Sequence, residues 1–190
     1  MESSPLVQFY RKAKAVCILR GYGSEIDTVE SRHFDGASPE EFLHQYVWVV
    51  LNAGMKNQVA QGIFQRFFDS KCDLQVIRHR GKRSAIRCAL REYEKWYTAM
   101  LSADSKPAYL ETLPWIGPVT KYHLARNLGL DVAKPDRHLT RLADHFGFRD
   151  VQEMCQNVSL STGDRVGVVD VVLWRASNLG MKPIHEKEVA

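Results

Sequence analysis

Several features that would place a chain in a common functional class are missing from this sequence. The four cysteines are widely scattered, and they form no Cys-x-x-Cys pair or histidine-rich spacing of the kind that metal sites use; they are Cys17, Cys72, Cys88 and Cys155. The longest uninterrupted apolar stretch, Tyr46–Leu51, is far too short to cross a bilayer. There is also no charged-then-apolar N-terminal signal. We therefore expect an intracellular protein with free thiols that uses no metal or other cofactor and does not bind membranes.

A large excess of charge of one sign is also missing. Among 190 residues, 26 Lys and Arg face 22 Asp and Glu, so the formal net charge is only +4. This mild excess permits a polyanionic partner without demanding one. Positive charge is concentrated locally in the run Arg78–Arg83, followed by Arg87 and Arg91. The run is either a solvated helix start or a patch that faces phosphates.

No period-2 run of any length and no Walker-type phosphate loop occur, so the sequence predicts an all-α fold. Ser38, Pro39 and Glu41 form a helix start with a capping box. The apolar residues that follow predict a helix buried on most sides. The ranges of the other expected helices are 6–20, 82–103, 106–112, 118–128, 136–146, 150–157 and 163–178, with a further helix after Gly54.

The connectors at 31–37 and 129–135 contain Gly or Pro and are the best boundaries between lobes. We expect a two-lobed helical protein with a cleft between the lobes. The central lobe would span 34–128, and 1–33 together with 129–190 would form the second. Asp136 would then lie at the seam.

The stretch Leu113–Lys121, LPWIGPVTK, predicts a helix, a tight turn and a second helix that starts at Pro118. The first N–H groups of that second helix would be unpaired, and the helix dipole there favours an anion such as a phosphate. Gly117 allows close backbone approach, Thr120 offers a hydroxyl and Lys121 a charge. Such a turn would hold a nucleic-acid backbone without reading its sequence.

The pattern L-P-x-I-G-x-x-T, followed by Pro135-Asp136-Arg137-His138-Leu139, resembles the helix-hairpin-helix–Gly/Pro–Asp motif of the DNA glycosylase superfamily that includes endonuclease III. The stretch Phe42–Phe68 is similar to the buried helix, loop and helix that precede this motif in the family. The resemblance covers roughly residues 38–146. The cysteine cluster that endonuclease III-like members carry after the catalytic Asp is missing, so the resemblance implies a member without the iron–sulfur cluster.

By this resemblance, Asp136 matches the catalytic carboxylate of the family. The role is physically reasonable, because breaking an N-glycosidic bond builds positive charge on the sugar, which a carboxylate can stabilise while it orients or deprotonates a water. The alternative is that Asp136, which follows Pro135 and precedes an apolar-periodic segment, is a helix N-cap. The two roles are compatible.

Two hairpin positions depart from the family pattern. Val119 stands where many members have a lysine that attacks the sugar as a Schiff-base nucleophile. Lys121 is a poor substitute, because at about 100° per residue it projects from nearly the opposite side of a helix. The resemblance therefore implies hydrolysis without a lyase step. Trp115 stands where the family usually has Gly, and it would be strained if the position requires φ > 0.

A glycosylase must extrude the target nucleotide and fill the gap that it leaves. The loop 52–57 matches the place of the family's gap-filling residue; Asn52 or Met55 could fill the gap, or the loop could be a plain turn. The residues that we expect to contact DNA are Asn52, Met55, Lys56, Trp115, Gly117, Val119, Thr120 and Lys121. The candidates for the base pocket are Trp48, Tyr122, His138 and Trp174.

The hypothesis that follows is a monofunctional DNA N-glycosylase, acting as a monomer on double-stranded DNA, that flips a damaged, mismatched or modified base and leaves an abasic site. Two alternatives stay open. One is a base-modifying transferase on the same scaffold, and the other is a non-catalytic DNA-binding module that uses the hairpin as a phosphate clamp.

Overall fold

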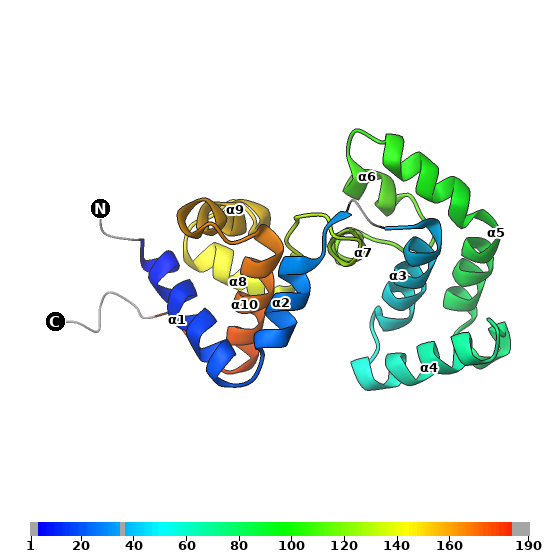
Figure 1. The fold of residues 1–190 in the computed structure, drawn as a ribbon, viewed down its shortest axis with the longest axis horizontal. Helices are drawn as coiled ribbons and strands as arrows, with labels where there is room; N and C mark the ends of the chain where they lie inside the picture. Colours follow the sequence, from blue (N-terminus) through cyan, green and yellow to red (C-terminus); the bar gives the residue numbers. More distant parts are fainter. Residues whose placement is uncertain (1–3, 35–36, 184–190) are drawn as a thin grey trace. The chain divides into compact units, whose positions relative to one another are not determined.

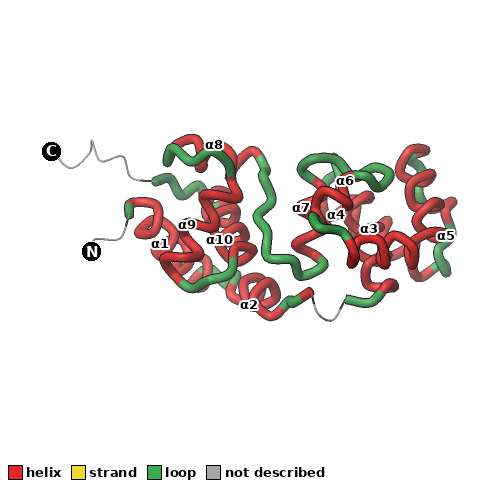
Figure 2. Tube along the Cα trace, turned by 90° about the horizontal axis from the view of Figure 1, so that it is seen from above, coloured by secondary structure: helices red, strands yellow, loops and turns green. Residues whose placement is uncertain are grey.

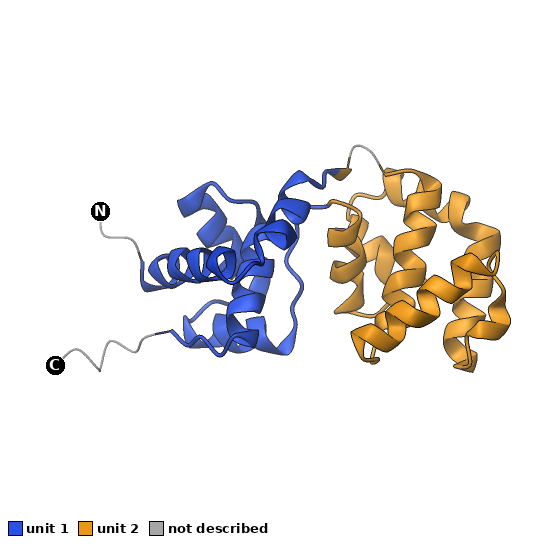
Figure 3. Ribbon diagram, turned by 60° about the horizontal axis from the view of Figure 1, so that its bottom comes forward, with its two compact units in different colours: residues 1–33, 130–190 blue, residues 34–129 orange. Residues whose placement is uncertain are grey.

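The computed structural model describes residues 4–34 and 37–183, and every regular element in these residues is helical (Figures 1 and 2). The predicted all-α fold class is confirmed. The chain forms two compact units: Met1–His33 with Leu130–Ala190 is unit 1, and Phe34–Gly129 is unit 2 (Figure 3). No helix among the described residues combines the length and apolarity that a membrane crossing needs.

Unit 2 is built around one buried helix, α3, which packs against α4, α5 and α7. Its start matches the prediction, since the Ser38 hydroxyl accepts the N–H of Glu41 at 3.2 Å and Pro39 takes the first helical position. Phe42 and Tyr46 are among its fully buried side chains. The helices of unit 2 are α3 (Pro39–Asn52), α4 (Asn57–Asp69), the 3₁₀ helix η2 (Leu74–Val76), α5 (Arg80–Ser102), α6 (Lys106–Glu111) and α7 (Thr120–Asn127).

Unit 1 is organised in the same way around α10, which packs against α1, α2, α8 and α9 (Figure 1). Val168, Val169, Val172 and Leu173 of α10 are fully buried. Both ends of the sequence therefore contribute to one apolar core. The helices of unit 1 are α1 (Pro5–Leu19), α2 (Gly23–Ser31), α8 (Arg137–His145), α9 (Val151–Thr162) and α10 (Val166–Asn178).

One helix was not predicted, and several predicted helix boundaries differ from the structure, among them the start of α10, which is Val166 rather than residue 163. Helix α2 was not predicted, because its N-cap, Tyr22, makes no side-chain cap and Ile26 is its only buried residue, so its sequence carries little signal. Helix α9 continues to Thr162, where Gly163 ends it in the left-handed conformation at φ 80°. Helix α7 begins at Thr120 rather than Pro118.

The end of α2 is fixed by one arginine. Nη1 of Arg165 donates to the carbonyl oxygens of Val29 and Glu30, each at 3.2 Å, and of Arg32 at 2.6 Å. Its Nε lies 3.7 Å from the carboxylate of Asp131. The last carbonyls of a helix have no partner within the helix, so a cation placed here satisfies them and also interacts favourably with the helix dipole.

We expect Arg165→Met to lower the free energy of unfolding by about 1–3 kcal/mol, because the carbonyls at the end of α2 lose a charged donor while the apolar stem is kept. Urea denaturation followed by circular dichroism measures the effect. Arg141→Met, at an exposed position of α8, is the control and should change stability by less than about 0.5 kcal/mol. Equal effects of the two substitutions would contradict the role given to Arg165.

Candidate active site and DNA-contacting segments

The hairpin between α6 and α7 is fastened to the core of unit 2. Leu113 and Ile116 are buried, and the hydroxyl of the buried Tyr46 on α3 donates to the carbonyl oxygen of Pro114 at 2.5 Å. Burial raises the pKa of the Tyr46 hydroxyl, so Tyr46 stays a neutral donor. The turn is therefore held in place by α3 and is part of the packed unit.

Trp115 occupies the left-handed region, with φ 67°, which is where a residue other than glycine is strained. Trp115 is 43 % exposed, and its ring lies against the first turn of α5. A Cβ added at Gly81 would come within 2.4 Å of the ring, and the ring centroid of His79 lies 5.1 Å away, edge to face. Packing on α5 thus holds Trp115 in an unfavourable backbone conformation, and Gly81 provides the space.

Two polar side chains of the hairpin are engaged within it. The N–H of Gly117 donates to Oγ1 of Thr120 at 2.7 Å, and the Lys121 ammonium pairs with the carboxylate of Glu111 on α6. Both contacts lie within the hairpin and stabilise the turn. Contact of these two side chains with phosphate stays a prediction.

The N-terminus of α7 is open. Its N-cap, Val119, makes no side-chain cap and is 40 % exposed. Within the described part of the chain, the N–H groups of Val119 and Thr120 have no acceptor, whereas the N–H of Lys121 donates to the carbonyl of Gly117 at 3.0 Å. Two backbone donors at the positive end of a helix dipole are available to an anion.

The loop between α3 and α4 carries the candidates for the gap-filling residue. Asn52 is the last residue of α3, Lys56 is the N-cap of α4, and Gly54 turns the chain with φ 67°. Met55 is half-buried, and Lys56 is exposed. The loop therefore presents a polar, an apolar and a charged side chain from one short turn.

Lys82 is a residue of this region whose role the sequence analysis missed. It belongs to the basic run 78–83, yet it is only 3 % exposed, so both interpretations of that run, as a solvated helix start or a phosphate patch, fail for this residue. Its Nζ donates to the carbonyl oxygens of Leu51 and Ala53, each at 2.7 Å, and burial lowers the pKa of its ammonium. No local signal in the basic run distinguishes Lys82 from its neighbours, because its two acceptors lie 31 and 29 residues away in the chain.

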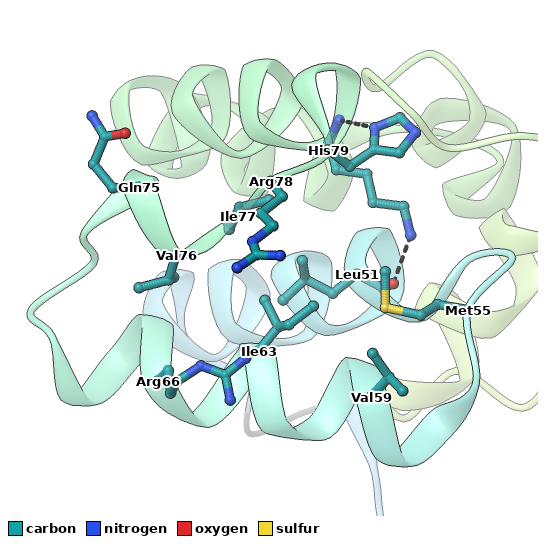
Figure 4. Close-up of a pocket in the computed structure, with 11 residues that line it drawn as sticks. Leu51, Met55, Val59, Ile63, Arg66, Gln75, Val76, Ile77, Arg78 and His79 are labelled. Carbon is teal, nitrogen blue, oxygen red and sulfur yellow. Dashed lines mark hydrogen bonds between the residues drawn. The ribbon is translucent and has the colours of Figure 1, made fainter.

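A cavity of about 700 Å³ lies within unit 2 (Figure 4). Its walls are apolar side chains of α3, α4 and η2, and Leu51, Met55 and Ile63 point into the space between α4 and α5. Cationic groups surround one part of it. The full lining is Leu51, Met55, Val59, Ile63, Arg66, Gln75, Val76, Ile77, Arg78, His79 and Lys82.

In unit 1, Asp136 is the N-cap of α8, as the structural alternative predicted. Its Oδ1 accepts the N–H of His138 at 2.8 Å and of Leu139 at 3.0 Å. Its carbonyl oxygen accepts the N–H and the hydroxyl of Thr140, both at 2.8 Å. Among the described residues, no group donates to Oδ2. The half-buried carboxylate is thus fixed through Oδ1, and the lone pairs of Oδ2 can accept a hydrogen bond from a water or a substrate.

The connector that leads to Asp136 is held to α9 and α10. The N–H of Lys134 donates to the carboxylate of Asp170, which is 1 % exposed, and the N–H of Ala133 donates to Gln152 Oε1 at 2.9 Å. The carboxylate of Asp131 accepts the N–H of Gly167 at 3.0 Å. These contacts fix the backbone on which Asp136 is mounted.

The four candidates for the base pocket are divided between the units and are all half-buried. Trp48 packs edge to face on Phe64, with ring centroids 5.5 Å apart, and the Tyr122 ring has the Lys121 ammonium 5.2 Å from its centroid. In unit 1, Trp174 has the Arg175 guanidinium 4.8 Å from its ring centroid. Nε2 of His138 accepts from Nε of Arg137 at 3.4 Å. None of the four lines the cavity of unit 2, and their role stays a prediction.

Among the described residues, no group of three or more His, Cys, Asp or Glu side chains is arranged so that it could bind a metal ion.

Comparison with known proteins finds solved structures with a similar fold. No family model matches the sequence, and no curated protein matches it. Among solved structures, the chain is similar to the 8-oxoguanine glycosylase/lyase of Methanocaldococcus jannaschii in complex with a 15mer DNA containing 8-oxoguanine, with a TM-score of 0.69, 17% identity, and coverage of 95% of this chain and 99% of that one. It is also similar to the 8-oxoguanine DNA glycosylase of Thermotoga maritima, with a TM-score of 0.69, 16% identity, and coverage of 95% and 100%.

At these identities the likeness establishes the fold, and it does so over almost the whole of each chain. The predicted helical glycosylase fold is therefore confirmed.

The packing of Trp115 on Gly81 predicts that the effect of Gly81→Ala on stability changes sign when the Trp115 ring is removed. Gly81→Ala should destabilise the protein by about 1–3 kcal/mol, because the new Cβ collides with the ring. In a Trp115→Gly background the ring is gone, and the same substitution should stabilise by up to about 1 kcal/mol, since Ala favours a helix over Gly. The four proteins form a double-mutant cycle that urea denaturation measures.

Gly62→Ala, in the interior of α4, is the control for helix propensity, because a Cβ there meets its nearest neighbour, Arg66, at an ordinary 3.5 Å. It should stabilise both backgrounds equally. If the effect of Gly81→Ala is the same with and without Trp115, the packing argument is wrong.

Proposed function

We propose that this protein is a monofunctional DNA N-glycosylase that flips a damaged, mismatched or modified base out of double-stranded DNA and hydrolyses its N-glycosidic bond. The observation that carries the proposal is the carboxylate of Asp136, which is fixed through Oδ1 and whose Oδ2 accepts no hydrogen bond from the residues that the structure describes. The fold shared with solved 8-oxoguanine DNA glycosylases supports it.

The chemistry follows from the free carboxylate oxygen. Hydrolysis of an N-glycosidic bond passes through a sugar with positive charge, which an ionised carboxylate stabilises. The same oxygen can orient or deprotonate the attacking water. Because the cap at Oδ1 locks the side chain, Oδ2 is preorganised and needs no reorientation during the reaction.

The grip on DNA is assigned to the central lobe, 34–128, and the chemistry to the lobe formed by 1–33 and 129–190. In the hairpin, the N–H groups of Val119 and Thr120 bind a phosphate, Gly117 permits its approach, and Trp115 and Lys121 flank it. In the loop after α3, Asn52 or Met55 fills the space of the flipped nucleotide, and Lys56 contacts the backbone.

The absence of a lyase step rests on the position that Val119 occupies. A Schiff base needs an unhindered neutral amine near the sugar. Lys121, two residues further on, is paired with Glu111, and its side chain is 17% exposed.

The decisive experiment separates the two roles of Asp136. In Asp136→Asn, the amide oxygen can still accept the N–H groups of His138 and Leu139, so we expect the fold to survive while base release falls by about 10²- to 10⁴-fold. Release of free base is measured by mass spectrometry from a panel of lesion-bearing duplexes and naturally modified viral DNAs. A duplex with 8-oxoguanine comes first, because the solved neighbours act on it.

Asp150→Asn is the matched control. Asp150 caps α9 by accepting the N–H of Glu153 at 2.8 Å, so this variant makes the same chemical change at a helix start of unit 1 outside the proposed site. Its activity should equal that of the wild type. Unchanged base release in Asp136→Asn would refute the catalytic role. If no substrate yields a free base although DNA binds, the protein is a base-modifying transferase or a phosphate clamp.

Borohydride trapping tests the proposed lack of a lyase step. When the protein turns over its substrate in the presence of borohydride, we expect no covalent complex with DNA on a denaturing gel, because no amine stands at the position of Val119. Strand breaks should appear only after alkali. A trapped complex that disappears in Lys121→Gln would show that Lys121 is a nucleophile and would overturn this part of the proposal.

A further inference from the structure

The first turn of α5, residues 79–82, contacts both of the segments assigned to DNA. On one side Gly81 and His79 support the ring of Trp115 in the hairpin. On the other side Lys82 binds the carbonyl oxygens of Leu51 and Ala53, which flank Asn52 at the end of α3. One helical turn therefore connects the hairpin to the loop that carries Asn52 and Met55.

We propose that Lys82 is a positioning residue that sets the loop 52–56 in the conformation that fills the gap in DNA. The inference rests on the proposed function, because it assumes that this loop enters the duplex.

The contacts of the loop support this role. Its backbone hydrogen bonds are local, such as the N–H of Ala53 to the carbonyl of Val49 at 3.0 Å and the N–H of Met55 to the carbonyl of Asn52 at 3.1 Å. Within residues 4–34 and 37–183, the hydrogen bonds that tie residues 51–56 to a distant part of the chain are those from Lys82. Loss of its ammonium would remove both of these hydrogen bonds between the loop and α5.

The chemistry of Lys82 suits the task. The carbonyls at the end of α3 carry the negative end of the helix dipole and lack partners within the helix. An ammonium at this point satisfies two of them at once. Among the described residues, no carboxylate lies within ion-pair distance of Lys82, so its ammonium interacts with these carbonyl oxygens instead. Burial disfavours the charged form, and the two carbonyls offset part of that cost.

The position of Met55 explains how the tether acts on DNA. Leu51, Met55 and Lys82 line the same cavity, so the tether and the apolar candidate for gap filling are neighbours (Figure 4). The N–H groups at the start of α7, which are proposed to bind phosphate, belong to the hairpin, and no backbone hydrogen bond among the described residues joins the hairpin to this loop. Lys82 should therefore affect recognition of a gap in the duplex far more than general affinity for DNA.

The test compares two duplexes of the same sequence, one intact and one with a tetrahydrofuran abasic analogue. The ratio of their dissociation constants measures gap filling and requires no hydrolysis. For the wild type we expect tighter binding to the abasic duplex. For Lys82→Met we expect this preference to fall by about tenfold or more, with affinity for the intact duplex changed by less than about twofold.

Two further variants make the test specific. Lys95→Met removes an exposed lysine of the same helix, where Lys95 pairs with Glu92 on the surface, and should leave the ratio unchanged. Lys82→Arg keeps a cation with several donors and should restore most of the preference. If Lys82→Met does not fold, Lys82→Gln, which keeps one donor group, is measured in the same way.

The results of this binding test can be told apart from those of the base-release experiment that tests the proposed function. If no base is released from any substrate but the abasic preference depends on Lys82, the glycosylase proposal fails and the positioning role stands. If base is released and Lys82→Met keeps the full preference, the positioning role is refuted. It is also refuted if the wild type does not prefer the abasic duplex.

Discussion

The unpaired backbone groups at the ends of helices are the constraint on which the candidate site depends. Each helix leaves N–H groups at its start and carbonyls at its end without partners. Three such ends differ in this respect: Asp136 caps the start of α8, Lys82 binds the carbonyls at the end of α3, and no described side chain caps the start of α7. Closed ends fix the geometry, and the open end is available for a ligand.

Much of this could be predicted from local sequence. The Ser38–Glu41 start, the turn at 113–119 and the position of Asp136 before an apolar helix all depend on neighbours in the chain. The strain at Trp115 could also be anticipated, because the resemblance marked that position as one where glycine is usual. In each case residues close in sequence determine the backbone conformation.

What could not be predicted depends on contacts between distant residues. The carbonyls that bind Lys82 are 29 and 31 residues away from it in the chain, so a basic run gives no sign that one of its members is buried. The carboxylate of Asp170 accepts the N–H of Lys134, which lies 36 residues away in the chain. Helix α2 was missed because Ile26 is its only fully buried residue, so its sequence shows no apolar periodicity, although Val29 also packs against the core.

The contact between Trp115 and Gly81 also has a consequence for how such sequences diverge. A side chain larger than hydrogen at position 81 collides with the indole as it lies in the structure and requires the ring to shift or to be lost, whereas glycine at 115 is compatible with either residue. Substitutions at positions 81 and 115 are therefore energetically coupled. Among related chains, tryptophan in the hairpin should occur together with glycine in the first turn of the preceding long helix, and this pairing would identify relatives that overall identity is too low to reveal.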